Sequence, residues 1–124
     1  MMIIGVGVDL CQSSRWQRLL DRYGERSLRR MLSEEEVFFL LSGSPKCLAE
    51  RAAGRWALRE AVGKAMGVGL SGWNLRELRY SENGVKTLGS LKKKLESLGV
   101  DKIHATISHD GGLSVALVVL EKKT

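Results

Sequence analysis

The sequence predicts an α+β protein in which a long central helix packs on an antiparallel sheet. Residues 47–66 are rich in alanine and leucine and contain no proline, as a long helix requires. Residues 103–108 and 114–121 are β-rich segments joined by His-Asp-Gly-Gly, which is typical of an antiparallel hairpin. Another β-rich segment, residues 3–10, opens the chain. Together these segments predict one helix crossing a small sheet.

The opening segment is predicted to be a buried strand that ends near Asp9. Ser14 and Gln17 have the spacing of a capping box, so we expect a helix to start there and to end at Gly24. The side of this helix that faces the core would carry Trp16, Leu19, Leu20 and Tyr23.

The remaining elements follow from the same kinds of local pattern. Ser33 and Glu36 repeat the capping-box spacing and predict a second short helix. The only proline of the chain lies in a break at residues 42–45, before the long helix, and Gly67 is expected to cap the end of that helix. Beyond it we expect a strand, a turn and a lysine-rich amphipathic helix at residues 73–81, 82–84 and 87–98.

Length and composition limit the possibilities. The chain has 124 residues, which fits a single domain over residues 1–124. Its net charge of +6 favours an acidic partner or a phosphorylated ligand without saying which. No targeting or membrane-spanning segment is predicted, so we expect no membrane partner. Cys11 and Cys47 form no metal-ligand motif and are expected to be reduced thiols of a cytoplasmic protein.

Asp9 is the first residue with potential chemistry. It follows Gly5 and Gly7 at the end of the predicted strand, where a carboxylate is well placed for a metal ion and the glycines allow a phosphate or another chain to approach. Leu10 stands where a dinucleotide-binding motif would need its third glycine, so that motif is excluded. An alternative is that Asp9 simply caps the next helix.

Glu60 and Lys64 form the second candidate group. With Trp56 they recur every four residues and so share one face of the long helix. A glutamate oxygen can bind Mg²⁺, and a lysine one turn later can neutralise a phosphate. The alternative is an ordinary ion pair between Glu60 and Lys64 on a helix surface.

His109 and Asp110 form the third candidate group. Neighbouring residues on an extended chain point in opposite directions, so adjacency alone does not make them a catalytic dyad. The alternative is a pair of ordinary turn residues.

A cluster of arginines in the first quarter of the chain is the fourth candidate feature. It is either a docking surface for an acidic partner or a solvated face, and a lysine patch at residues 92–94 raises the same question. The arginines are Arg15, Arg18, Arg22, Arg26, Arg29 and Arg30.

Taken together, three blocks resemble the holo-acyl-carrier-protein synthase family, the single-domain phosphopantetheinyl transferases. The first is Gly-Val-Gly-Val-Asp at residues 5–9 with Arg15 six positions later. The second is Gly-Arg-Trp-Ala-Leu-Arg-Glu-Ala-Val-Gly-Lys-Ala-Met-Gly-Val-Gly at residues 54–69, and it is the most specific. The third is Ile-Ser-His at residues 107–109 with the strand after it. The resemblance covers nearly the whole chain.

The resemblance implies an activity and a set of roles. The enzyme would transfer 4′-phosphopantetheine from coenzyme A to a serine of an apo-acyl carrier protein and release 3′,5′-ADP. Asp9 and Glu60 match the carboxylates that hold Mg²⁺ with the coenzyme A pyrophosphate, and Lys64 matches the lysine on the phosphates. Arg55 and His109 match residues at the adenosine 3′-phosphate end. Glu60 is the candidate to take the serine proton, with charge stabilised by Lys64 and the metal ion.

The resemblance also implies partners. Arg15 matches a carrier-docking arginine, and the family assembles as a homotrimer whose sites lie between protomers. We expect longer-range guidance of the acidic carrier by Arg18, Arg22 and Arg26. Two departures from the family pattern are Arg59, where the family usually has lysine, and residues 83–87, which lack a proline. No role is carried onto the latter segment.

Two other functional classes were weighed. A small basic nucleic-acid-binding module would explain the charge, but only 6% of the residues are aromatic and able to stack on bases. It would also leave Glu60 without a role, so we expect no nucleic acid partner. An inactive interaction protein with the same fold is the other alternative. The sequence does not identify the carrier protein.

Overall fold

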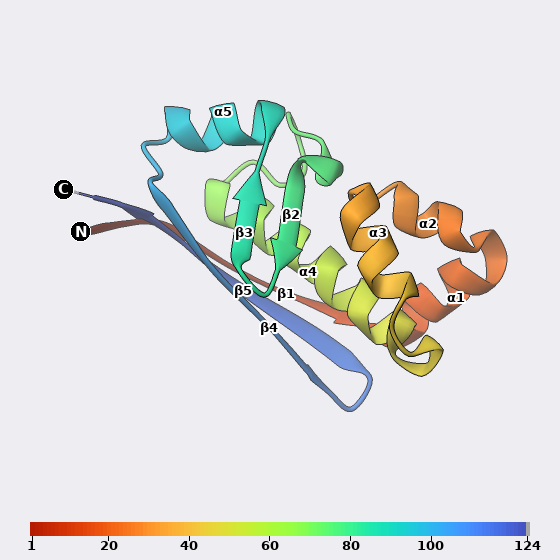
Figure 1. Cartoon of the computed structure of the whole chain (residues 1–124). Coiled ribbons are helices and arrows are strands. Elements are labelled where there is room, and N and C mark those ends of the chain that lie inside the picture. Colours follow the sequence, from red (N-terminus) through yellow and green to blue (C-terminus); the bar gives the residue numbers. More distant parts are fainter. Residues whose placement is uncertain (124) are drawn as a thin grey trace.

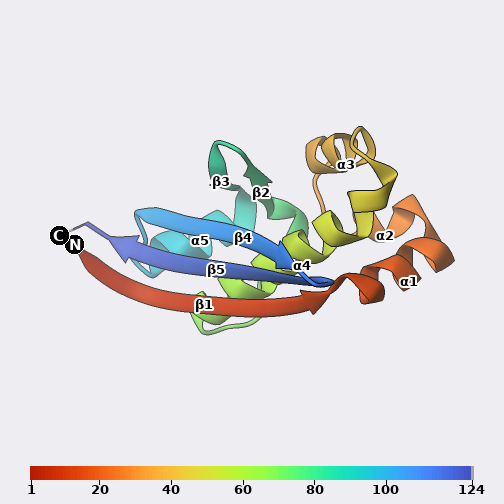
Figure 2. The same ribbon diagram turned by 90° about the horizontal axis from the view of Figure 1, so that it is seen from below.

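The computed structural model describes residues 1–123, and a three-stranded antiparallel sheet forms one layer of the molecule. The strands are β1 (Met2–Gln12), β4 (Lys102–Asp110) and β5 (Leu113–Lys122), with β5 in the middle. Figure 2 shows them side by side, with both chain ends at one end of the sheet. The predicted α+β class with an antiparallel sheet is confirmed. Strand β1 continues three residues beyond Asp9, where we had expected it to end.

Helix α4 (Leu48–Met66) crosses the inner face of this sheet (Figure 1). Strand β1 lies directly on the helix backbone. A Cβ atom at Gly5 would be 1.9 Å from the carbonyl oxygen of Ala65, and one at Gly7 would be 1.9 Å from that of Ala61. No side chain fits at either position, so the two glycines admit the helix. They thereby bring Asp9 against the middle of α4.

Three short helices follow β1 and pack at the start of α4 (Figure 1). They are α1 (Ser13–Tyr23), α2 (Glu25–Arg29) and α3 (Glu34–Leu41). Gly24 ends α1 with a positive φ of 61°, as predicted. Ser33 caps α3 by accepting a hydrogen bond from the Glu36 amide at 3.3 Å, so the predicted cap is confirmed.

The predicted start of α1 is wrong. The residue at the N-cap position is Gln12, and its side chain makes no capping bond. The amide of Ser13 donates to the carbonyl oxygen of Gly112 at 2.9 Å, so the helix begins directly from the sheet. The Gln17 side chain bonds to Asp21 within the helix. The predicted core side is also wrong at its end, because Tyr23 is 43% exposed.

The segment after α4 differs most from the prediction. Within the predicted strand at residues 73–81, Leu75–Glu77 form a 3₁₀ helix and only Leu78–Ser81 form a strand, β2. A second strand, β3 (Gly84–Thr87), was missed; it pairs with β2 and precedes α5 (Gly89–Ser97). Asn74 and Glu77 form a capping box that starts the 3₁₀ turn. This box replaces the first part of the expected strand.

The core lies between α4 and the layers that surround it. Fully buried side chains of α4, Leu58 and Val62 among them, meet Val118 and Leu120 from the inner face of β5. Cys11 and Cys47 are both free thiols, as predicted. Within residues 1–123 no helix has both the length and the hydrophobicity needed to cross a bilayer.

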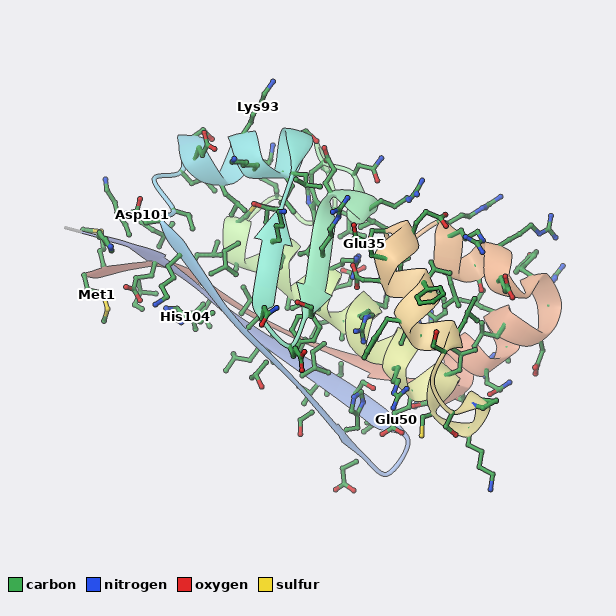
Figure 3. All side chains as sticks on the ribbon, in the orientation of Figure 1. Met1, Glu35, Glu50, Lys93, Asp101 and His104 are labelled. Carbon is green, nitrogen blue, oxygen red and sulfur yellow. The ribbon has the colours of Figure 1, made fainter. Side chains whose placement is uncertain are left out.

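The outer face of the three-stranded sheet is apolar and open. We call it the outer sheet face; its exposed apolar side chains come from β1 and β5. Val6 is 57% exposed, Val8 53% and Leu10 63%. Val8 lies directly across from Leu117, which is 42% exposed. His104 projects from β4 on this side, away from the helices (Figure 3). The prediction that the first strand is buried is therefore wrong for one of its two faces.

Candidate active site

Asp9 and Lys64 meet across the contact between β1 and α4. The Lys64 ammonium donates to Asp9 Oδ1 at 2.9 Å and to the Val8 carbonyl oxygen at 3.1 Å. Asp9 lies inside β1, and α1 begins only at Ser13, so Asp9 does not cap that helix. Lys64 therefore bonds to the strand, and not to Glu60 as the alternative of a surface ion pair on the helix would require. The fold thus joins two of the predicted site residues.

Glu60 reaches the same region from one helical turn earlier. Glu60 lies close enough to Cys11, a buried thiol on β1, for its charge to affect that thiol. Burial raises the pKa of Cys11, the positive charge of Arg15 opposes that rise, and the carboxylates of Asp9 and Glu60 add to it. The charges of Asp9, Glu60 and Arg15 therefore all lie near the Cys11 thiol. The junction of β1, α1 and α4 gathers the residues that the first two sequence motifs supplied.

The donor set at this junction suits a hard divalent cation. Asp9 and Glu60 offer carboxylate oxygens, which are the protein ligands that Mg²⁺ prefers. Asp9 already holds a positive group, the ammonium of Lys64, with a salt bridge of 2.9 Å. Among residues 1–123 no group of three or more histidine, cysteine or acidic side chains forms a closed metal cage. An ion bound here would complete its coordination with water or phosphate oxygens, as Mg²⁺ commonly does.

His109 lies against α4 nearer the start of the helix, at Gly54. It belongs to β4, because the hairpin turn consists only of Gly111 and Gly112, both with positive φ. Its Nδ1 is 2.7 Å from Ser114 Oγ and 3.7 Å from Glu50 Oε1. The ring bonds to Ser114 and faces α4, so it forms no dyad with Asp110. Sequence reasoning missed Ser114 and Glu50, although a two-residue turn places Ser114 directly across from His109.

Arg59 is part of a buried ionic cluster. It is completely buried and donates to Glu36 Oε1 at 3.0 Å. It also donates to the backbone carbonyl oxygens of Leu75, Leu78 and Arg55. Burial lowers the pKa of Arg59, and the charge of Glu36 opposes that shift. The fork-shaped guanidinium serves several acceptors at once, which the single ammonium of a lysine would match less well. Arg59 therefore ties α4 to α3 and β2 and touches no solvent.

Arg55 shares Glu36 with Arg59. Its Nε lies 3.1 Å from Glu36 Oε2, and its guanidinium lies over the rings of Phe39 and Tyr80 at 5.8 and 5.5 Å. Burial lowers the pKa of Arg55, and Glu36 opposes the shift. Only 8% of the residue is exposed. The fold thus places Arg55 in the buried cluster, and its expected role at coenzyme A stays a prediction.

A cavity of about 490 Å³ opens beside this junction, between α1, α2 and α4. Its floor is apolar and includes Trp16, Leu19 and Trp56, whereas Arg15 and Arg26 contribute cationic groups to its lining. The Arg15 guanidinium lies over the Trp56 ring at 5.5 Å. We call this cavity the arginine pocket; nothing in the sequence pattern pointed to it. Arg18 and Arg22 are exposed on α1 nearby.

Comparison with known proteins shows the family to which the chain belongs. Residues 5–118 match the 4′-phosphopantetheinyl transferase superfamily. The chain is 36% identical over 127 residues to the holo-[acyl-carrier-protein] synthase of Maridesulfovibrio salexigens, covering 98% of this chain and 100% of that one. A holo-[acyl-carrier-protein] synthase structure from Neisseria meningitidis superposes with a TM-score of 0.86 at 28% identity, covering 98% and 100% of the two chains. A Bacillus anthracis synthase in complex with CoA (3′,5′-ADP) gives 0.79 at 28%, covering 99% and 100%.

Proposed function

The chain belongs to the 4′-phosphopantetheinyl transferase superfamily, and on that premise we propose that it is a holo-[acyl-carrier-protein] synthase. It transfers the 4′-phosphopantetheine group of coenzyme A to a serine of an apo-acyl carrier protein and releases 3′,5′-ADP. The observation that carries this proposal is the junction where β1 and α4 bring Asp9 and Lys64 within 2.9 Å. Residues 1–124 act as one domain, and we place the enzyme in the cytoplasm, where its free thiols stay reduced.

The chain's own residues supply most of the chemistry. The serine oxygen forms a bond to the β-phosphorus as the bond from that phosphorus to 3′,5′-ADP breaks. Glu60 accepts the proton of the serine hydroxyl, and the Lys64 ammonium stabilises the negative charge on the phosphoryl oxygens. A magnesium ion held by Asp9 and Glu60 would supply further positive charge next to the coenzyme A pyrophosphate.

Helix α4 carries or contacts the residues that we propose for both phosphate-binding ends of the coenzyme A site. Gly54, against which His109 lies, precedes Glu60 by six residues, which is about 9 Å along a helix. We assign the pyrophosphate to the end with Lys64 and the adenosine 3′-phosphate to the end with His109 and Arg55. Six residues also rotate a helix by about 240° beyond a full turn, so the two ends lie on different sides of α4.

Mass spectrometry of an apo carrier protein tests the activity. The carrier is incubated with this enzyme, coenzyme A and Mg²⁺, and we expect its mass to rise by one phosphopantetheine group. A parallel reaction with EDTA is expected to leave the carrier unmodified, and added Mg²⁺ is expected to restore transfer. An unchanged carrier mass in every Mg²⁺ reaction, with several carriers tested, would overturn the proposed activity.

We also propose that the enzyme assembles as a homotrimer through the outer sheet face. Val6, Val8 and Leu10 share this face with Leu117 and are all exposed, and an exposed apolar patch of this kind marks an interaction surface. A chain of 124 residues buries a modest share of its surface alone, so covering this face would add stability. From the resemblance to the synthase family, we further propose that each active site lies between two protomers.

Leu117→Asp should convert the trimer to monomers and remove most of the activity. Leu117 lies at the centre of the outer sheet face, and a carboxylate there would be buried without a partner in the trimer. Light scattering after size-exclusion chromatography measures the mass. Leu98→Asp, an equally exposed leucine at the end of α5, is the matched control and should stay trimeric. A parent protein that is active as a monomer would contradict the proposal.

The arginine pocket and the exposed arginines of α1 are our proposed docking surface for the carrier. An acidic carrier helix would meet the charges, and an apolar carrier side chain would enter the pocket. Arg15 would matter most, because it lines the pocket and is also near the site: its positive charge acts to lower the pKa of Cys11, two residues after Asp9. Exposed charge pairs are individually worth about 0.2–1 kcal/mol, so Arg18, Arg22 and Arg26 would act together.

The double variant Arg15→Glu, Arg18→Glu should raise the KM for the carrier at least roughly tenfold at low salt. In the parent, the KM for the carrier should rise with salt, because salt screens the attraction. The KM for coenzyme A should change little. Lys92→Glu, Lys93→Glu is the matched control on α5. If the two double variants exchanged these results, the lysine patch would be the docking surface instead.

A further inference from the structure

Ser114 is a buried polar residue to which the proposed mechanism gives no role. It lies on β5 directly across from His109, and none of its surface is exposed. Its hydroxyl donates to the backbone carbonyl oxygen of Glu50 at 3.1 Å. The same oxygen lies 2.7 Å from His109 Nδ1. The start of α4, which carries Glu50, lies beside the hairpin of β4 and β5 (Figure 3). Ser114 therefore connects the histidine to the helix.

The direction of these bonds determines which nitrogen of His109 carries hydrogen. A carbonyl oxygen only accepts, so the single hydrogen of the Ser114 hydroxyl is directed at Glu50. Towards His109 the hydroxyl offers a lone pair, and Nδ1 must donate to it. The Glu50 carboxylate approaches the same nitrogen, at 3.7 Å. Within residues 1–123 no hydrogen bond engages the other nitrogen, Nε2.

Gly54 holds the ring from a third side. A Cβ atom at this position would lie 2.9 Å from His109 Cε1 and 2.8 Å from Ile107 Cγ2. The imidazole therefore packs on the bare backbone of α4, and any side chain at residue 54 would displace it. Serine hydroxyl, helix backbone and strand together fix both the position and the orientation of the ring.

The arrangement is unsuited to nucleophilic catalysis by Ser114. In a serine, histidine and carboxylate triad, the serine and the carboxylate bond to opposite nitrogens of the ring. Here Ser114 and Glu50 both approach Nδ1, and Ser114 is fully buried. The free nitrogen is the one that can meet a ligand, so the three residues form a holder for His109 rather than a nucleophilic site.

We propose that Ser114 is a positioning residue that holds His109 with Nδ1–H turned inward and Nε2 presented to the 3′-phosphate of coenzyme A. This inference rests on the proposed function. A phosphate bound at Nε2 accepts a hydrogen from it, so the bound ring carries hydrogens on both nitrogens. One of them bonds to Ser114 and the other to the ligand. Loss of Ser114 removes the inward acceptor and lets the ring turn away.

The test compares coenzyme A with 3′-dephospho-coenzyme A, which lacks only the group that His109 would contact. For Ser114→Ala we expect the KM for coenzyme A to rise about three- to tenfold, with kcat nearly unchanged. The KM for 3′-dephospho-coenzyme A should stay at the parent value. A double variant, Ser114→Ala with His109→Ala, should be no worse than His109→Ala alone. Ser97→Ala is the control, since it also removes a hydroxyl bonded to a backbone carbonyl oxygen.

An equal rise of both KM values in Ser114→Ala would overturn the proposal, because it would indicate a general structural effect. Nitrogen NMR gives an independent readout, and the chain has only two histidines to assign. In the parent we expect neutral His109 to carry its hydrogen on Nδ1, and in Ser114→Ala that preference should disappear. A neutral His109 in the parent with hydrogen on Nε2 would refute the arrangement even if transfer from coenzyme A is normal. Failure of transfer with every carrier would refute the proposed function instead.

Discussion

Asp9→Ala and Glu60→Ala are each expected to lower the rate of phosphopantetheine transfer about a hundredfold or more. Each change removes one of the two carboxylates that would hold Mg²⁺, and Glu60→Ala also removes the group that accepts the serine proton. The fold should survive, because Asp9 is bonded only to a flexible lysine and Glu60 is half-buried at the junction. Transfer to an apo carrier is measured by mass spectrometry over a range of Mg²⁺ concentrations, with circular dichroism to check folding.

Asp21→Ala is the control for this pair of variants. Asp21 is an exposed carboxylate on α1 that bonds to Gln17, so its loss should leave transfer unchanged. Near-parental activity of folded Asp9→Ala or Glu60→Ala would rule out the proposed metal site. A loss that disappears at high Mg²⁺ concentration would instead support it, because weaker ion binding can be offset by more ion.

Glu36→Ala is expected to lower the free energy of unfolding by about 3–5 kcal/mol. The carboxylate compensates two guanidinium groups, and one of them, on Arg59, has no exposed surface at all. Removing it leaves two buried positive charges next to one another, which is far more costly than losing a surface pair. Urea unfolding at a single protein concentration measures the change, since oligomers are stabilised by concentration.

Glu35→Ala is a matched control one residue away on the same helix. Glu35, labelled in Figure 3, forms a salt bridge with Arg79 of β2 at 3.1 Å, and its side chain is 73% exposed. Solvent screens such a pair, so its loss should cost no more than about 1 kcal/mol. If Glu36→Ala and Glu35→Ala unfold at the same urea concentration, the buried cluster does not contribute as proposed.

The placement of the site was predictable where the signal is local. The β-rich segment around Asp9 predicted a strand, and the four-residue spacing of Glu60 and Lys64 predicted a shared helix face. Both predictions are confirmed by β1 and α4. The hairpin was also predicted, but its turn was placed two residues early, at His109. That error concealed the pairing of His109 with Ser114, which the correct two-glycine turn dictates.

Two capping patterns were misread because the backbone contacts around them were not visible in the sequence. Ser14 had capping-box spacing, yet the amide of Ser13 is taken by Gly112 from the sheet, so the helix starts earlier. Asn74 and Glu77 had the same kind of spacing and do form a box, within what was expected to be a strand. Sequence spacing shows which caps are possible, and the backbone contacts that form on folding decide where each element begins.

The sequence by itself determined the class of the fold and the order of its main elements. These two features depend on periodicity and spacing over a few residues, whatever the rest of the chain does. The residues proposed to act on phosphates came instead from the resemblance of three sequence blocks to a known family. Only the tertiary structure decided that Lys64 meets Asp9, separated by 55 residues, and that Glu36 joins Arg55 and Arg59. It also decided that one face of β1 remains open. Those outcomes depend on which elements pack together and at what distance. Charges far apart in the sequence interact only once the fold brings them close, and whether an apolar face is covered depends on what packs against it.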